Sequence, residues 1–290
     1  MAINENLRGA AFMALSMAGF AVEDMCLKAA ARAMPLGQVM LMVGIAGMIV
    51  FAVMATRQSE AMFHPVMISR PMLVRSGFEM VGRVFYALAL ALTTLSTTSA
   101  ILQATPLMVI AGAALLFRES VGWRRWSAVL IGFLGVLVIL RPGLSGFSTL
   151  SLLAVAGMLG FAGRDLATRA APKMLSNRQL GIMGFAVLAV SGLLILWQEG
   201  GPRPTDTAGL VLVAGTAAFG ISGYHALTAA MRTGEVGFVT PFRYTRLVFA
   251  LILAMVVFGE RPDMATLAGS ALIVGSGVYA LLRQRRARSV

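Results

Sequence analysis

Long apolar runs alternate with short polar connections along the whole chain. A helix needs about 20 mostly apolar residues to cross the hydrocarbon core of a bilayer, and ten runs approach or exceed that length. They span residues 7–32, 36–56, 72–94, 98–117, 124–141, 149–171, 177–198, 207–231, 236–258 and 264–283. Turn-forming residues separate several of them, such as Pro35 and Gly37 after the first run and Pro142 after the fifth. The pattern predicts an all-α integral membrane protein with ten transmembrane helices.

Composition supports this prediction and excludes other classes. Of the 290 residues, 58% are hydrophobic and 12% are charged, whereas a soluble domain carries about 25% charged residues. The apolar content excludes disorder, and the single cysteine, Cys26, excludes a disulfide scaffold. A net charge of +12 would fit a nucleic-acid-binding protein. The basic residues lie between apolar runs and form no basic domain, so we expect the lipid bilayer, and no nucleic acid, as a partner.

The positions of the cations predict the orientation of the chain. With the N-terminus inside the cell, 15 basic residues fall on inside segments and 5 on outside segments. Basic residues favour the cytoplasmic side, which places both termini in the cytoplasm. Four cations remain within the spans: Arg83, Arg164, Arg243 and Arg246.

The two halves of the chain resemble each other at an offset of 141 residues. The offset relates pairs in several helices: Gly19 with Gly160, Phe20 with Phe161, Asp24 with Asp165, Phe78 with Phe219, Gly82 with Gly223, Ala89 with Ala230, Phe117 with Phe258 and Glu119 with Glu260. We therefore divide the chain into residues 1–143 and 144–290, each a repeat of five helices. Because five is odd, the second repeat must enter the membrane from the opposite face, which predicts two inverted repeats around a central cavity.

The motifs within each repeat resemble the EamA unit of the drug/metabolite transporter superfamily. One is Phe117-Arg118-Glu119, followed by residues 121–126 and a glycine-spaced helix that closes at residues 140–143. The second copy has Phe258-Gly259-Glu260, followed by the helix at residues 272–279. It departs from the first at Arg261-Pro262-Asp263, where the first copy has two tryptophans and two arginines.

The resemblance implies a multi-pass transporter in a bacterial cytoplasmic (inner) membrane. It implies alternating access and, by analogy with bacterial exporters, the export of amino acids, including aromatic ones. Two alternatives stay open: uptake of a vitamin or nucleoside-like metabolite, and export of cationic drugs. The sequence contains no motif of an intramembrane enzyme, and we expect no enzymatic activity, no cofactor and no bound metal. Ten helices suffice for a monomer, which is the expected state.

Charged residues within the spans are the candidates for the substrate site. Each costs at least about 2.5–3.5 kcal/mol at the centre of a transmembrane helix, so they should face one another or an aqueous cavity. Spacing of four residues predicts three pairs: Glu79 with Arg83, Asp24 with Lys28, and Asp165 with Arg169. Other charges in the spans include Glu23 and the pair Arg243 and Arg246, whose own helix contains no acid. These two arginines need partners from other helices or from a ligand.

Aromatic residues and prolines complete the predicted site. The predicted substrate-binding residues are Asp24, Glu79, Arg83, Tyr86, Arg164, Asp165, Tyr224, His225, Arg243 and Arg246. Their nearly balanced charges favour a small zwitterionic substrate, whose carboxylate would bind an arginine and whose ammonium would bind an acid. Pro106 and Pro241 are predicted to break their helices and to act as hinges or binding points.

Overall fold

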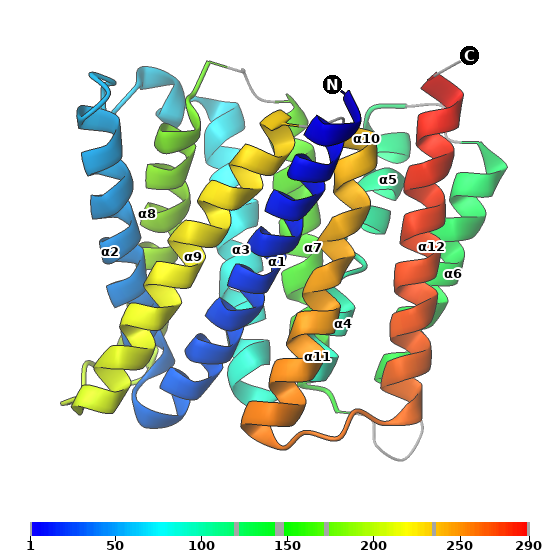
Figure 1. Cartoon of the computed structure of the whole chain (residues 1–290). Helices are drawn as coiled ribbons and strands as arrows, with labels where there is room; N and C mark the ends of the chain where they lie inside the picture. The colour runs from blue at the N-terminus through cyan, green and yellow to red at the C-terminus, as the bar shows by residue number, and fades with distance from the viewer. Residues whose placement is uncertain (1, 119–121, 143–147, 171–173, 234–235, 289–290) are drawn as a thin grey trace.

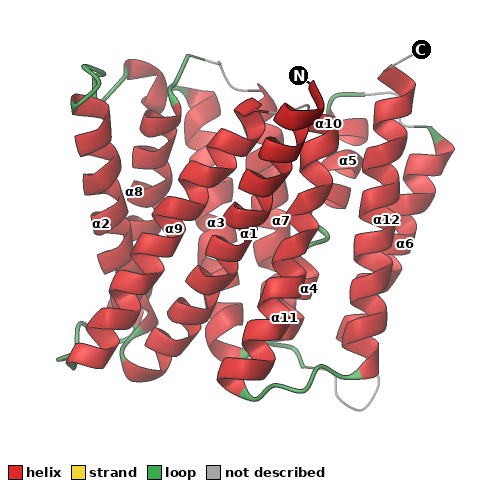
Figure 2. Ribbon diagram, in the orientation of Figure 1, coloured by secondary structure: helices red, strands yellow, loops and turns green. Residues whose placement is uncertain are grey.

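The described part of the chain is a bundle of helices. The computed structural model describes residues 2–118, 122–142, 148–170, 174–233 and 236–288, and these residues contain no β-strand (Figure 2). Its helices are α1 (Ala2–Ala33), α2 (Leu36–Thr56), η1 (Pro65–Ile68), α3 (Arg70–Leu92), α4 (Leu95–Leu102), α5 (Thr105–Leu116), α6 (Trp123–Leu140), α7 (Ser151–Ala170), α8 (Asn177–Gln198), α9 (Thr207–Thr233), α10 (Val236–Val239), η2 (Thr240–Tyr244), α11 (Thr245–Phe258) and α12 (Met264–Arg288).

The bundle has the character of a multi-pass membrane protein. Among the described residues, 6 helices are long and apolar enough to cross a membrane, and Trp126–Leu140 and Met264–Ala280 are shorter apolar stretches. The helices α3 and α7 cross the bundle between the same two ends (Figure 1), but their charged side chains lower their hydropathy. Large apolar side chains such as Leu115, Trp197 and Val256 are exposed on the outside of the protein, as expected of a surface that contacts lipid.

Two of the predicted spans are interrupted helices. The fourth predicted span consists of α4 and α5, with Pro106 in the first turn of α5. The ninth consists of α10, η2 and α11, with Pro241 in the first turn of η2. Proline has no backbone N–H to donate to the preceding turn, so each interruption coincides with its proline. The role of these prolines as hinges stays a prediction.

The packing of the helices has two-fold character. The main helix pairs are α1 with α9, α2 with α8, α3 with α7, and α6 with α12. In the second repeat, α7, α8, α9 and α12 are equivalent to α1, α2, α3 and α6. The α1–α9 pair is therefore equivalent to the α7–α3 pair, and the α2–α8 and α6–α12 pairs each join two equivalent helices. Helix α1 begins at the end of the bundle that carries both termini, whereas its equivalent α7 begins at the opposite end (Figure 1). The repeats are therefore inverted relative to each other, as the odd number of helices predicted.

Glycines let the two equivalent helix pairs approach closely. A Cβ atom added to Gly160 of α7 would lie 2.4 Å from the backbone nitrogen of Gly82 in α3. In the equivalent pair, a Cβ on Gly19 of α1 would lie 3.3 Å from the Cα of Gly223 in α9. Small residues at such positions are typical of helix packing in membranes. These contacts hold α3 against α7, which carries Asp165, and α9 against α1, which carries Asp24.

Carboxylates connect the two repeats at the end of the bundle opposite the termini. Glu199 accepts hydrogen bonds from the backbone N–H groups of Leu36 (3.0 Å) and Gly37 (2.8 Å). Glu260 accepts from the backbone N–H groups of Leu95 (2.7 Å) and Ser96 (3.0 Å). Each carboxylate thus satisfies N–H groups in the first turn of a helix from the other repeat. The repeat partner of Glu260, Glu119, and the predicted boundary at residues 143–144 lie outside the fully described parts of the chain.

Candidate functional site

A cavity of about 520 Å³ lies between the two repeats. Nine of the ten predicted substrate-binding residues line it: Asp24, Glu79, Arg83, Tyr86, Arg164, Asp165, Tyr224, Arg243 and Arg246. Pro106 lines it as well, whereas Pro241 does not. The side chain of His225 is exposed and lies outside the cavity, so the structure gives no support to a role for it. That the lining residues bind a substrate stays a prediction.

Glu79 of α3 is the centre of one charge network. Its carboxylate is 2.9 Å from Arg75 Nη1, 3.6 Å from Arg83 Nη2 and 3.9 Å from Arg164 Nη1 of α7. Only 3% of the Glu79 side chain is exposed, so its charge is neutralised by arginines rather than by water. The pairing with Arg83 follows the predicted spacing, and Arg75 and Arg164 join it.

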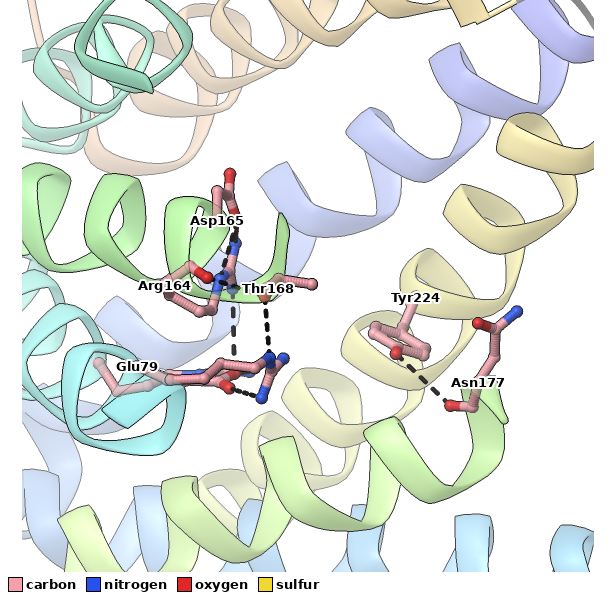
Figure 3. Close-up of polar contacts among 8 residues, drawn as sticks. Glu79, Arg164, Asp165, Thr168, Asn177 and Tyr224 are labelled. Atoms are coloured by element: carbon pink, nitrogen blue, oxygen red, sulfur yellow. Dashed lines mark hydrogen bonds and ion pairs between the residues drawn. The ribbon is translucent and has the colours of Figure 1, made fainter. Parts of the chain in front are cut away.

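Arg75 corrects a prediction from the charge pattern. The charge pattern assigns Arg75 to the 15 basic residues of the inside segments, whereas in the structure it is buried within α3 and lines the cavity. Its Nε donates a hydrogen bond of 3.0 Å to Thr168 Oγ1 of α7 (Figure 3). Arg75 therefore helps to connect the two helices on this side of the cavity.

Asp24 of α1 is the centre of a second network, and its partner differs from the prediction. Its Oδ2 accepts hydrogen bonds from Arg246 Nη2 (2.6 Å) and Tyr86 Oη (2.9 Å). The guanidinium of Arg246 also lies 5.3 Å from the centroid of the Phe20 ring, at the distance of a cation–π contact. The predicted pair of Asp24 with Lys28 is wrong.

Lys28 turns away from the cavity acids because other acceptors lie closer to it. Its Nζ donates to the backbone carbonyls of Leu90 (2.8 Å) and Thr93 at the end of α3. Those carbonyls have no partner within the helix, so a buried ammonium satisfies them. Lys28 therefore connects α1 to the end of α3 and contributes nothing to the binding surface.

Asp165 of α7 also takes a partner that spacing did not predict. Its Oδ1 accepts from Nε (3.0 Å) and Nη2 (2.8 Å) of the adjacent Arg164, as Figure 3 shows. Arg164 thereby joins Asp165 to the Glu79 network, and its guanidinium stacks 5.0 Å from the centroid of Phe161. Nothing is described of the side chain of Arg169, the predicted partner.

Further polar side chains line the cavity in addition to the ten predicted substrate-binding residues. They are Glu23, Arg75, Gln103, Thr105, Thr168, Thr216 and Tyr244. Gln103 donates from Nε2 to the backbone carbonyl of Arg243 (3.2 Å), which joins the interruption after α4 to η2. A signal for Gln103 existed, because it stands three residues before a proline in a span. Thr105 precedes Pro106 and shares its signal, whereas the neutral hydroxyls of Thr168 and Thr216 gave none.

The cavity can bind a polar molecule through opposite charges. Among the described residues, its lining contains five arginines and four carboxylates, which come from both repeats. Aromatic rings of Phe20, Tyr86, Phe161 and Tyr224 lie among them. The Tyr224 hydroxyl donates to the backbone carbonyl of Asn177 (3.4 Å) at the start of α8 (Figure 3). No group of three or more His, Cys, Asp or Glu in the searched part of the chain could hold a metal ion.

Comparison with known proteins gives consistent matches. The model of the EamA-like transporter family matches residues 7–141 and, a second time, residues 148–282. An S-adenosylmethionine uptake transporter of Rickettsia prowazekii is 23% identical over 72% of this chain and 70% of its own length. A riboflavin transporter of Vibrio cholerae is 28% identical over 62% of this chain and 60% of its own.

Two further matches extend the range of substrates and support the fold. A pseudopaline exporter of Pseudomonas aeruginosa is 28% identical over 70% of this chain and 72% of its own length. A solved crystal structure covers 99% of both chains with a TM-score of 0.64 at 22% identity. The crystal structure supports the fold alone. The named relatives include both uptake transporters and an exporter.

Proposed function

The chain belongs to the EamA-like transporter family, and we propose that it moves a zwitterionic metabolite with an amino-acid head group across the membrane by alternating access. It is a multi-pass protein of the bacterial inner membrane. Its relatives with named functions are transporters of small molecules. The observation that carries the proposal is the mixed charge of the cavity, which offers cations and anions to one substrate.

The first form of the proposal is the export of free amino acids, aromatic ones included. Their carboxylate and ammonium match the two kinds of charge in the cavity, and the rings of Phe20, Tyr86 and Phe161 supply apolar surface for a side chain. A purely cationic drug fits less well, because the arginines in the described lining outnumber the acids. Inverted repeats can exchange their conformations and so open a central site to either side of the membrane.

The second form is the uptake of a nucleoside-like molecule that carries the same head group. The S-adenosylmethionine uptake transporters of Rickettsia support it. S-adenosylmethionine contains an α-ammonium and a carboxylate, together with a sulfonium and an adenine ring that aromatic residues could stack on. Riboflavin, in contrast, has no amino-acid head group.

Transport by the purified protein tests the proposal. The protein would be reconstituted in liposomes, and uptake and efflux would be measured with labelled phenylalanine, tryptophan, S-adenosylmethionine, riboflavin and a cationic dye. We expect saturable transport of an amino acid or of S-adenosylmethionine, absent from protein-free liposomes. Saturable transport of riboflavin or the dye, with none of the zwitterions, would overturn the proposal.

A further inference from the structure

The repeat relates Glu23 to a residue of opposite charge. Glu23 of α1 and Arg164 of α7 are separated by the offset of 141 residues, and so are Glu79 of α3 and Gly220 of α9. In the α3–α7 pair, Arg164 faces Glu79 at 3.9 Å. In the equivalent α1–α9 pair, Glu23 faces Gly220, where an added Cβ would lie 2.8 Å from Glu23 Oε1. One helix pair therefore contains both charges, and the other contains a charge without its counterpart.

The remaining acids of the cavity have partners within the protein. Asp24 is paired with Arg246, Asp165 with Arg164, and Glu79 with Arg75 and other arginines. Among the described residues, Glu23 has neither a hydrogen bond nor an ion pair to another side chain. A carboxylate at membrane depth needs a compensating charge or water. Because Glu23 lines the cavity, that compensation can come from the contents of the cavity.

Arg243 is the corresponding cation. It lies in η2, where the helix is interrupted, and its backbone carbonyl is held by Gln103. Within the described part of the chain, no carboxylate lies within ion-pair distance of its guanidinium, whereas the cavity's Arg75, Arg83, Arg164 and Arg246 each have one. Arg83 and Arg246 attract the Glu23 carboxylate from a longer distance, but the described part of the cavity contains one acid and one arginine that form no direct ion pair within the protein.

We propose that Glu23 binds the ammonium group of the substrate and Arg243 its carboxylate. The assignment rests on the proposed function and adds to it the two residues that determine specificity. Gly220 contributes by having no side chain, which leaves room for the Glu23 carboxylate against α9. A substrate that lacks either charged group would lose one contact and leave one protein charge unpaired, and such losses strongly favour the complete substrate.

Ligand analogues that lack one group test the two residues separately. The probes are L-phenylalanine, phenethylamine without the carboxylate, 3-phenylpropionate without the ammonium, and S-adenosylmethionine. Their affinities would be measured on the full-length protein in nanodiscs. In Glu23→Gln we expect the zwitterion to bind about tenfold more weakly or worse, with 3-phenylpropionate unchanged. In Arg243→Gln we expect the same loss, with phenethylamine unchanged.

Matched variants separate a binding role from a folding defect. Glu5→Gln removes the same charge from an exposed position of α1 and should bind as wild type does. Gly220→Ala moves the Glu23 carboxylate without removing its charge, and we expect weaker binding of the zwitterion. Gly77→Ala adds a methyl group where nothing lies within 4 Å and should have no effect. Thermal unfolding and size-exclusion profiles would verify that each variant is folded.

The outcomes distinguish this assignment from the broader function. If wild type binds neither zwitterion, the proposed function fails and the assignment fails with it. If wild type binds a zwitterion and folded Glu23→Gln or Arg243→Gln keeps its affinity, the assignment alone is wrong. Loss of the zwitterion in both variants, with the matching analogue retained in each, would support it.

Discussion

The inner faces of α3 and α9 occupy equivalent places in the two repeats but carry different chemistry. Helix α3 presents Arg75, Glu79 and Arg83 to the cavity. The positions one repeat later in α9 are Thr216, Gly220 and Tyr224. The Glu79 carboxylate forms ion pairs with Arg75 and Arg83 of its own helix and with Arg164 of α7. The α9 face contributes no charge at the three equivalent positions, so Glu23, which it faces, finds no ion-pair partner on this helix.

The difference shows what this duplicated chain has kept and what it has changed. Close glycine contacts persist in both helix pairs, at Gly160 against Gly82 and at Gly19 against Gly223, so the packing is shared. The charges are not. Two identical repeats would line the two sides of the cavity with the same charges. In this chain, a network of ion pairs around Glu79 lies on one side and Glu23, which forms no ion pair among the described residues, lies on the other, so the two sides differ. A zwitterion, whose ends differ, suits such a cavity.

The largest expected effect comes from Glu79→Gln. The substitution leaves Arg75, Arg83 and Arg164 without their shared anion at membrane depth, and breaking a buried ion pair costs about 3–5 kcal/mol. We expect a much lower yield of folded protein and a strongly reduced Tm, measured by thermal unfolding in detergent.

The same chemical change on the other side of the cavity is the control. Glu23→Gln removes an acid that has no partner among the described residues, so its Tm should equal or exceed that of wild type. Equal destabilisation by Glu79→Gln and Glu23→Gln would show that the two sides do not differ as described.

Much of the fold follows from local features of the sequence. The length of each apolar run predicted the spans, and the prolines marked both interruptions. The offset between the repeats showed that the second must be inverted. The length of an apolar run reflects the thickness of the bilayer, and a proline acts on the backbone of its own helix. Such features can be predicted without knowing which helices are neighbours.

The pairing of charges could not be predicted in the same way. Spacing along one helix identifies neighbours only within that helix, and it correctly paired Glu79 with Arg83. It failed for Asp24, because Arg246 reaches it from another helix 222 residues away. That Glu23 forms no ion pair among the described residues could not be predicted for the same reason, because it depends on which arginines the other acids bind. Arg75 was misplaced because it stands close to the end of its apolar run.

Asp24→Asn tests the second network and should have an intermediate effect. The amide can still accept from Tyr86 but leaves Arg246 without a counter-charge, and hydrogen bonds to charged groups contribute about 1.5–3 kcal/mol. We expect a moderate decrease in Tm and a loss of transport. Tyr86→Phe removes one hydrogen bond and keeps the ion pair, so its Tm should decrease less. A larger decrease in Tyr86→Phe than in Asp24→Asn would contradict this description of the network.

The smallest effect concerns an ion pair outside the cavity, between Glu60 in the connection after α2 and Arg178 in the first turn of α8. Hydrogen bonds from Arg178 and Ser176 lower the pKa of Glu60 from 4.5 to about 2. Because the pKa is lower in the folded state, the stabilisation is complete above pH 4.5 and fades as the pH falls towards 2. Glu60→Gln should lower the Tm by about 1–2 °C at pH 7, and the difference should narrow at pH 3.5. A difference that does not depend on pH would mean that the carboxylate charge is not its source.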